Sequence, residues 1–313
     1  MSIPPTISQY WQHQGMSRRD FLQFCAMTAA AMALPITMVS RIAAALENQP
    51  RPATIWLNFQ DCTGCTESMM RADAPSLERL LFDLISLDYH HTLQAAAGES
   101  AELARTQAMV ANEGNYLLIV EGSIPTDQAG YATTAGVSNQ DLFIEAAENA
   151  KAIIAIGTCA SYGGIARAYP NPTGAKSVGE LLTNNKPLIN IPGCPPLPVA
   201  ITGVIVHFLT FGEWPLLDNL QRPLAFFGRT VHDRCSRRAF YEKGLFASRF
   251  DDPGAKTGWC LYQLGCKGPF TYNACATTKW NDGVSFPMEA GHGCLGCSQP
   301  YFWDNDSFYR PLS

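Results

Sequence analysis

The stretch TIWLNFQDCTGC, residues 54–65, places two cysteines directly after a short run of apolar residues. The run 54–59 has the length and the aromatic and β-branched content of a buried strand. Three further apolar runs follow, at residues 116–120, 151–156 and 187–191. The segments 76–87, 139–150 and 199–211 are predicted to be helices, the first because its apolar residues recur at helical spacing. This alternation predicts an α/β domain with a doubly wound parallel sheet.

Four cysteines follow the ends of three predicted strands. Cys62 and Cys65 follow the first strand, Cys159 follows the third and Cys194 follows the fourth. Because the carboxyl ends of parallel strands share one edge of a sheet, we expect these thiols to meet there. Four thiolates suit a 4Fe-4S cluster or a zinc ion, and one close pair with two distant single cysteines favours the cluster. Disulfides, which are common in exported proteins, are a further alternative.

The regular pattern stops at about residue 221, and the rest is rich in glycine, proline, cysteine and aromatic residues. Such a segment needs disulfides or metal clusters to hold it together. It contains seven candidate ligands, which are His232, Cys235, Cys260, Cys266, Cys275, Cys294 and Cys297. Seven ligands divide naturally into a set of four and a set of three. The other histidines of the mature chain, His90, His91, His207 and His292, are interpreted as structural.

The N-terminus carries the parts of an export signal in the expected order. Arg18 and Arg19 precede an apolar run over residues 24–39, and three alanines at 43–45 form a cleavage site. A buried helix that happens to begin with two arginines is the alternative. The pattern predicts a twin-arginine signal peptide over residues 1–45. That route exports folded proteins, which suits a protein whose clusters are assembled in the cytoplasm.

Composition narrows the remaining possibilities. The chain has 313 residues, of which 47% are hydrophobic and 16% are charged, as in globular proteins. A net charge of −5 gives no sign of a nucleic-acid partner. No stretch after the leader approaches about 20 apolar residues, so we expect the mature chain to have no membrane anchor of its own.

Together these motifs resemble the small subunit of nickel–iron hydrogenases over essentially the whole chain. The motifs are DCTGCTES (61–68), VEGSIP (120–125), IGTCASYGG (156–164), NIPGCPP (190–196), HDRC (232–235), GWCLYQLGCKGP (258–269), TYNAC (271–275) and GHGCLGC (291–297). The resemblance implies a flavodoxin-like domain over residues 46–220, followed by an irregular iron–sulfur cluster-binding domain over residues 221–313.

The resemblance also implies three clusters in a row. A proximal 4Fe-4S cluster would be held by Cys62, Cys65, Cys159 and Cys194. A distal 4Fe-4S cluster would be held by His232, Cys235, Cys260 and Cys266. A medial 3Fe-4S cluster would be held by Cys275, Cys294 and Cys297, with Pro287 in the place of a fourth cysteine.

The implied reaction is the splitting of hydrogen at a nickel–iron centre in a separate large subunit, so no catalytic residue is expected in this chain. Electrons would pass through the proximal, medial and distal clusters to a cytochrome or another electron-transfer protein. Glu67 and Glu121 lie in the proximal motifs, either as proton-coupling groups or as scaffold carboxylates. Arg234, Arg237 and Arg238 lie near the expected exit, either as a docking surface or as an ordinary solvated cluster.

The resemblance implies an obligate heterodimer with the large subunit, or a dimer of such heterodimers. The twin-arginine translocase would export it to the periplasm, where it is free or held peripherally at the inner membrane by other subunits. Three other interpretations stay open. Subunits of respiratory complexes share the four-cysteine pattern but lack the tail ligands and the leader. A zinc- or disulfide-stapled exported protein would be colourless, and a hydrogen sensor would not need export.

Overall fold

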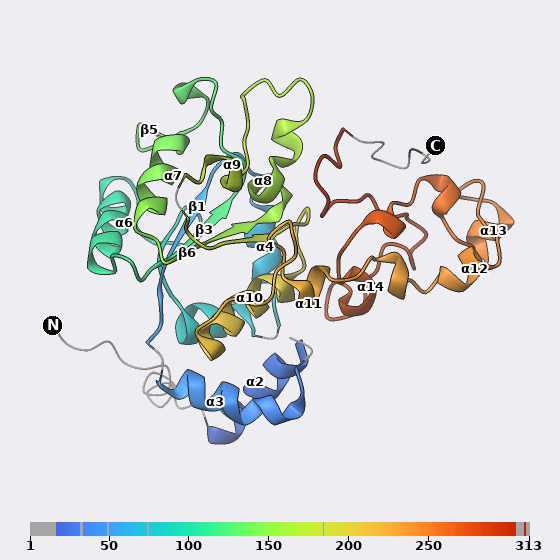
Figure 1. The fold of residues 1–313 in the computed structure, drawn as a ribbon, viewed down its shortest axis with the longest axis horizontal. Coiled ribbons are helices and arrows are strands. Elements are labelled where there is room, and N and C mark those ends of the chain that lie inside the picture. Colours follow the sequence, from blue (N-terminus) through green and yellow to red (C-terminus); the bar gives the residue numbers. More distant parts are fainter. Residues whose placement is uncertain are drawn as a thin grey trace.

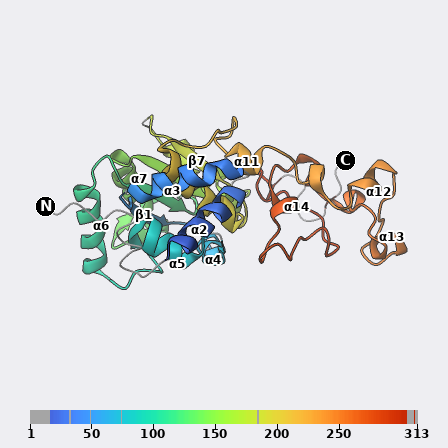
Figure 2. The same cartoon turned by 90° about the horizontal axis from the view of Figure 1, so that it is seen from below.

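The computed structural model describes residues 17–31, 34–48, 50–73, 75–183, 185–304 and 310. Figure 1 shows a large lobe, in which helices surround a sheet, and a smaller lobe formed by the end of the chain. Figure 2 shows that the smaller lobe projects from one end of the large one. We refer to these as the sheet lobe and the tail lobe (residues 228–304).

Five parallel strands form the sheet. They are β1 (Ala53–Asn58), β2 (Ser86–His90), β3 (Leu117–Glu121), β6 (Ala152–Ile156) and β7 (Leu188–Ile191). Their order across the sheet is β2-β1-β3-β6-β7, and every neighbouring pair is parallel. Counted among themselves, these strands have the order 2-1-3-4-5, which is that of flavodoxin-like folds. The predicted fold class is therefore confirmed.

Helices cover both faces of the sheet, because alternate side chains of each strand point to opposite faces. The main helices are α4 (Gly64–Met70), α6 (Glu99–Ala111), α7 (Asn139–Glu148), α8 (Gly157–Tyr162), α9 (Val178–Leu181) and α10 (Pro198–Phe211). Ile154 packs into a core that α4 and α10 close. Its neighbour Ile153 packs into the opposite core, which α6 and α7 close.

Shorter elements complete the sheet lobe. They are η1 (Ile36–Met38), η3 (Ala129–Tyr131), β4 (Thr133–Thr134), β5 (Val137–Ser138), η4 (Gly164–Arg167) and α11 (Leu224–Phe227). Phe226 and Phe227 of α11 pack into the core of the sheet lobe. The predicted boundary between the two domains, after residue 220, stays a prediction. Phe226 and Phe227 lie a few residues after it and still pack against the first domain.

One segment differs from the prediction. We expected a single helix over residues 76–87, but the structure has a helical turn α5 (Leu77–Arg79) and a π-helical turn η2 (Leu80–Leu84). Strand β2 then begins at Ser86. It was missed because it is an edge strand with the mixed sequence SLDYH, which lacks the apolar run typical of internal parallel strands.

The N-terminal segment forms a helical hairpin of α2 (Arg18–Ala31) and α3 (Val39–Asn48), which lies against α10. Ile42 and Leu46 are completely buried there. This hairpin overlaps the predicted signal peptide (residues 1–45) and continues to Asn48, and residues 1–16 and 32–33 of that peptide lie outside the described residues. Arg19 is exposed, and the side chain of Arg18 is not described. Among the described residues, no helix is both long and apolar enough for a membrane span.

The tail lobe consists of short turns. They are η5 (His232–Arg234), α12 (Arg238–Glu242), α13 (Pro253–Lys256), η6 (Tyr262–Leu264), η7 (Gly268–Phe270) and α14 (Cys275–Thr278). Its hydrophobic cluster has six buried members, which are Val231, Ala247, Leu261, Cys266, Phe286 and Met288. Three more cysteines, Cys235, Cys275 and Cys294, pack against this cluster. Cysteines therefore make up a large part of the interior of this lobe.

Candidate metal centres

The structure brings together the four cysteines that follow the strands. Cys62 and Cys65 flank the start of α4 after β1, Cys159 lies in α8 after β6, and Cys194 follows β7. Burial raises the pKa of the Cys65 thiol well above its usual value, and the charges of Glu121 and of the other three thiols raise it further. All eleven cysteines are free, so no disulfide links any of them. We call this group the proximal site.

Glycine keeps the space around the proximal thiols open. Gly157 has a φ of +86°, which side chains rarely adopt, and a Cβ on it would overlap the Sγ of Cys65. A Cβ on Gly64 would lie 3.0 Å from the Sγ of Cys62. Larger residues at these positions would therefore occupy the volume that the thiols surround.

A second group lies in the tail lobe. A single small cavity is lined by all four predicted distal ligands, which are His232, Cys235, Cys260 and Cys266. Burial lowers the pKa of His232, and the nearby charge of Arg238 lowers it further. A neutral imidazole is the form that binds metal. The ring of His232 also packs edge-on against Tyr241, with 4.5 Å between ring centroids.

The third group lies between the other two. Cys275, Cys294 and Cys297 line a cavity of about 620 Å³, together with Pro287. Burial raises the pKa of Cys294 to about 12, and the charges of neighbouring thiols add to this effect. We call Cys275, Cys294 and Cys297 the medial site. The group of His232, Cys235, Cys260 and Cys266 is the distal site.

Direct contacts connect the three sites in a line. Cys297 of the medial site receives a backbone hydrogen bond from Cys194 of the proximal site. The hydroxyl of Thr158 strengthens this junction, since it donates to the carbonyl of Cys297 and accepts from the backbone N–H of Gly193 at 2.9 Å. At the other end, the backbone N–H of Cys294 donates to the Sγ of Cys266 at 3.2 Å. The order is therefore proximal, medial, distal.

The donor atoms of all three sites fit iron–sulfur clusters. Burial raises the pKa of most of these cysteines, so they are neutral thiols without a metal, and iron bound to the sulfur atoms would favour the thiolate form. A single zinc ion would need ligand atoms about 2.0–2.3 Å from one point. Within the described residues, no three His, Cys, Asp or Glu side chains are grouped tightly enough to hold one metal ion.

The two carboxylates of the proximal motifs have different surroundings. Glu67 is exposed and forms an ion pair with Arg71 at 2.7 Å. Glu121 is only 1% exposed and accepts hydrogen bonds from the backbone of Cys65 and Thr66. The sequence motif could not separate them, because both glutamates lie within a few residues of a strand or cysteine.

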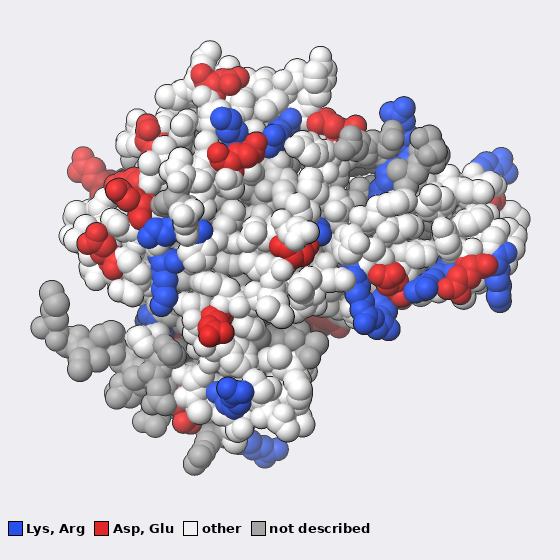
Figure 3. Space-filling view, viewed as in Figure 1, with Lys and Arg blue, Asp and Glu red and all other residues white. Residues whose placement is uncertain are grey.

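The three arginines near the expected electron exit do not form one surface. Arg237 is buried, and its guanidinium donates to the carbonyls of Met288 at 2.6 Å and Trp259 at 2.7 Å. Its inclusion in an exposed cluster was wrong, because sequence shows a charge but not the carbonyls that the fold places around it. Arg238 is exposed and pairs with Glu242. Figure 3 shows blue and red groups alternating along the lower edge of the tail lobe, so this face carries no patch of one sign.

Comparisons with known proteins match the two lobes to two family models and the whole chain to hydrogenase small subunits. Residues 227–310 match the C-terminal part of NiFe/NiFeSe hydrogenase small subunits, and residues 62–208 match the 20 kDa subunit of NADH ubiquinone oxidoreductase. The chain is 46% identical over 313 residues to the uptake hydrogenase small subunit of Afipia carboxidovorans, covering 100% of this chain and 85% of that protein. It is 45% identical to the hydrogenase-1 small chain of Escherichia coli (strain K12), covering 99% and 83%.

Solved structures give the same result. The reduced, active Ni-Fe-Se hydrogenase from Desulfomicrobium baculatum has a chain that aligns with a TM-score of 0.78 and 36% identity, covering 84% of this chain and 100% of that one. The actinobacterial-type NiFe-hydrogenase from Ralstonia eutropha aligns with a TM-score of 0.76 and 26% identity, covering 84% and 83%.

Proposed function

Because this chain belongs to the small subunits of nickel–iron hydrogenases, we propose that each of its three cysteine-rich sites holds one iron–sulfur cluster. The chain is the electron-transfer subunit of the enzyme and pairs with a hydrogenase large subunit. The number and types of the clusters, and the residues that bind them, are the content of the proposal.

The proposed ligands are those of the three sites. Cys62, Cys65, Cys159 and Cys194 hold a proximal 4Fe-4S cluster. His232, Cys235, Cys260 and Cys266 hold a distal 4Fe-4S cluster. Cys275, Cys294 and Cys297 hold a medial 3Fe-4S cluster, where Pro287 lines the cavity without offering a fourth sulfur.

One observation supports this assignment above the others: the eleven side chains fall into three groups that touch in sequence. Cys194 contacts Cys297, and Cys294 contacts Cys266. A linear arrangement of sites is what electron transfer through a protein requires, whereas three independent structural metals would have no reason to be neighbours.

Iron–sulfur clusters in these sites would supply carriers for single electrons. The chain's own residues bind them, exclude water and set the charge around them. The thiols of the medial site are half-buried, and Cys294 and Cys297 line the cavity that would receive the cluster. The imidazole of His232 is neutral where a thiolate would be anionic, which favours a higher potential at the distal site.

We further propose the partners and the location. Hydrogen is split at a nickel–iron centre in the large subunit, and the distal site passes electrons to a cytochrome or another electron-transfer protein. The N-terminal hairpin is a twin-arginine signal that directs the heterodimer to the periplasm. There it is free or held peripherally at the inner membrane by other subunits.

The decisive experiment is metal analysis with electron paramagnetic resonance on the heterodimer purified from its native membrane or periplasmic fraction. We expect about 11 iron atoms per small subunit, from two clusters with four iron atoms and one with three. We also expect a 3Fe-4S signal in the oxidised sample and nickel in the large subunit. Zinc in place of iron, or iron without a 3Fe-4S signal, would contradict the assignment of the tail lobe.

A further inference from the structure

Glu121 is a buried carboxylate that the electron-transfer role does not by itself explain. It ends β3, directly opposite Asn58 at the end of β1. Its oxygens accept from five donor groups, which are the backbone N–H groups of Cys65 and Thr66, the Thr66 hydroxyl, the Asn58 amide and the Trp56 indole. Every neighbour with which it shares a hydrogen bond donates, so the geometry suits the ionised carboxylate, which only accepts.

These hydrogen bonds hold the start of α4 in place. Oε1 of Glu121 accepts from the N–H of Cys65 at 2.9 Å and from that of Thr66 at 3.2 Å. Both amides belong to the turn that carries the Cys65 thiol into the proximal site. Because they are bonded to a carboxylate, neither is free to donate to a sulfur atom. Glu121 therefore fixes the position of Cys65 and also removes two N–H groups from the surroundings of the site.

His90 is connected to the carboxylate of Glu121 through the hydroxyl of Thr66. The Nδ1 of His90 accepts from the backbone N–H of Thr92 at 3.1 Å and of Leu93 at 3.3 Å, so this nitrogen carries no proton. The proton of the neutral ring is therefore on Nε2, which lies 3.2 Å from the hydroxyl of Thr66. Thr66 in turn donates to Glu121 at 2.5 Å. A directed chain runs from His90 through Thr66 to Glu121.

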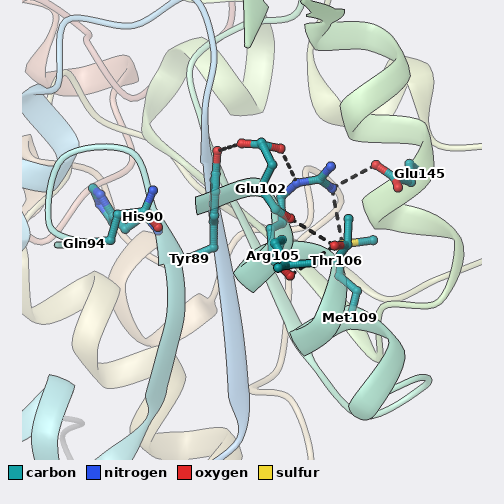
Figure 4. A network of polar contacts seen from close by, with 9 residues as sticks. Tyr89, His90, Gln94, Glu102, Arg105, Thr106, Met109 and Glu145 are labelled. Carbon is teal, nitrogen blue, oxygen red and sulfur yellow. Dashed lines mark hydrogen bonds and ion pairs between the residues drawn. The ribbon is translucent and has the colours of Figure 1, made fainter. Parts of the chain in front are cut away.

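Strand β2 positions this histidine. Figure 4 shows Tyr89 and His90 pointing away from each other, as alternate residues of a strand do. Tyr89 donates to Glu102 at 2.6 Å, in a network that continues to Arg105 and Glu145. On the other side of the strand, the backbone N–H of His90 donates to the side-chain oxygen of Gln94 at 3.3 Å, which helps to fix His90 in place. Burial raises the pKa of Glu121 and lowers that of His90, to about 4, so the histidine is neutral at physiological pH.

We propose that Glu121, oriented by Thr66 and His90, is a positioning residue of the proximal site that fixes Cys65 and sets the redox potential of the cluster bound there. The inference rests on the proposed function, since it needs a cluster at this site. A carboxylate beside the cluster disfavours the reduced, more negative state, so it holds the potential lower than a neutral group would.

The test compares E121Q with E67Q in the purified heterodimer. Both variants remove one carboxylate charge from the proximal motifs, but Glu67 is exposed and paired with Arg71, so E67Q is the matched control. The readout is the midpoint potential of the proximal cluster, from a redox titration followed by electron paramagnetic resonance, with iron content measured beside it. We expect E121Q to raise this potential or to lose the proximal cluster, and E67Q to do neither.

A second pair of variants tests the contribution of the chain through Thr66. T66V removes the hydroxyl between His90 and Glu121 without a change of charge, whereas T66S keeps it. We expect T66V to shift the proximal potential and T66S to match the wild type. Intact clusters with unchanged potential in both E121Q and T66V would overturn the inference. If the wild-type protein itself lacks a 4Fe-4S signal, the proposed function fails instead, so the two failures can be told apart.

Discussion

The sheet lobe and the tail lobe hold their thiols in opposite ways. In the sheet lobe two large apolar cores surround five parallel strands, and none of the proximal cysteines is a buried member of either core, although Cys65 packs against one of them. In the tail lobe the hydrophobic cluster is small, and Cys266 is one of its six buried members. The first lobe can fold without its metal, whereas the second uses its ligands as part of its interior.

Because of this difference, we expect the loss of one cysteine ligand to unfold the tail lobe but not the sheet lobe. This is the largest effect that we predict. Cys194→Ser would cost the proximal cluster, or about 4 iron atoms, while the sheet lobe stays folded. Cys266→Ser would unfold much of residues 228–304, because the distal cluster and the lobe's core are lost together. Hydrogen exchange and limited proteolysis measure this. Equal protection of the tail lobe in both variants would contradict the comparison.

The next largest effect tests whether the proximal site has room for any side chain at Gly157. Gly157→Ala would force a side chain onto a backbone with positive φ and against the Sγ of Cys65, so we expect loss of the proximal cluster. Gly212→Ala is the control, since Gly212 has a φ of +69° but nothing within 4 Å of an added Cβ. It should cost only about 1–2 kcal/mol of stability and no iron. Iron content and thermal unfolding distinguish the two.

A smaller effect tests whether hydrogen bonds from a buried arginine stabilise the interior of the tail lobe. Arg237→Ala would leave the buried carbonyls of Met288 and Trp259 without their donor, at a cost of about 2–5 kcal/mol. Arg238→Ala removes an exposed ion pair with Glu242 and should cost below about 1 kcal/mol. Local unfolding free energies from hydrogen exchange would measure both. Similar costs for the two arginines would mean that Arg237 is not part of the interior.

The smallest effect concerns the pH dependence of stability in the sheet lobe. Burial lowers the pKa of His90 from an ordinary 6.5 to about 4, so the unfolded chain binds the extra proton first as pH falls. The stability that comes from neutral His90 is complete above about pH 6.5 and declines towards pH 4, by roughly 1–3 kcal/mol. Exchange protection of β1 and β2 should follow this trend. His90→Gln should flatten it, and an unchanged slope in that variant would assign the trend to other groups.

The sheet and the proximal cysteines could be predicted because each depends on short, local patterns. An apolar run of five or six residues identifies an internal strand, and the shared edge of parallel strands then places Cys62, Cys159 and Cys194 together. Strand β2 could not be predicted in this way, since an edge strand needs no apolar run. The role of Glu121 depends on its register opposite Asn58, which no local pattern specifies.

The tail lobe could be predicted only in outline. Its ligands are visible as Cys and His in the sequence, but its turns have no period, so the neighbours of each residue follow from the packing alone. Arg237 illustrates the difficulty, since nothing in the sequence distinguishes it from the exposed Arg238 beside it. The grouping of ligands into sites came from the family resemblance, and the structure adds the order in which the sites touch.

The hydroxyl of Thr158 connects the two lobes at the junction of the proximal and medial sites. Electron tunnelling slows exponentially as the gap between donor and acceptor widens, so any hinge motion here would modulate the current through the enzyme. Thr158 bonds to Gly193 in the sheet lobe and to Cys297 in the tail lobe, so we expect it to limit such motion. Replacing Thr158 with Val would make the rate of intramolecular electron transfer depend on solvent viscosity, a dependence that the wild-type protein should lack.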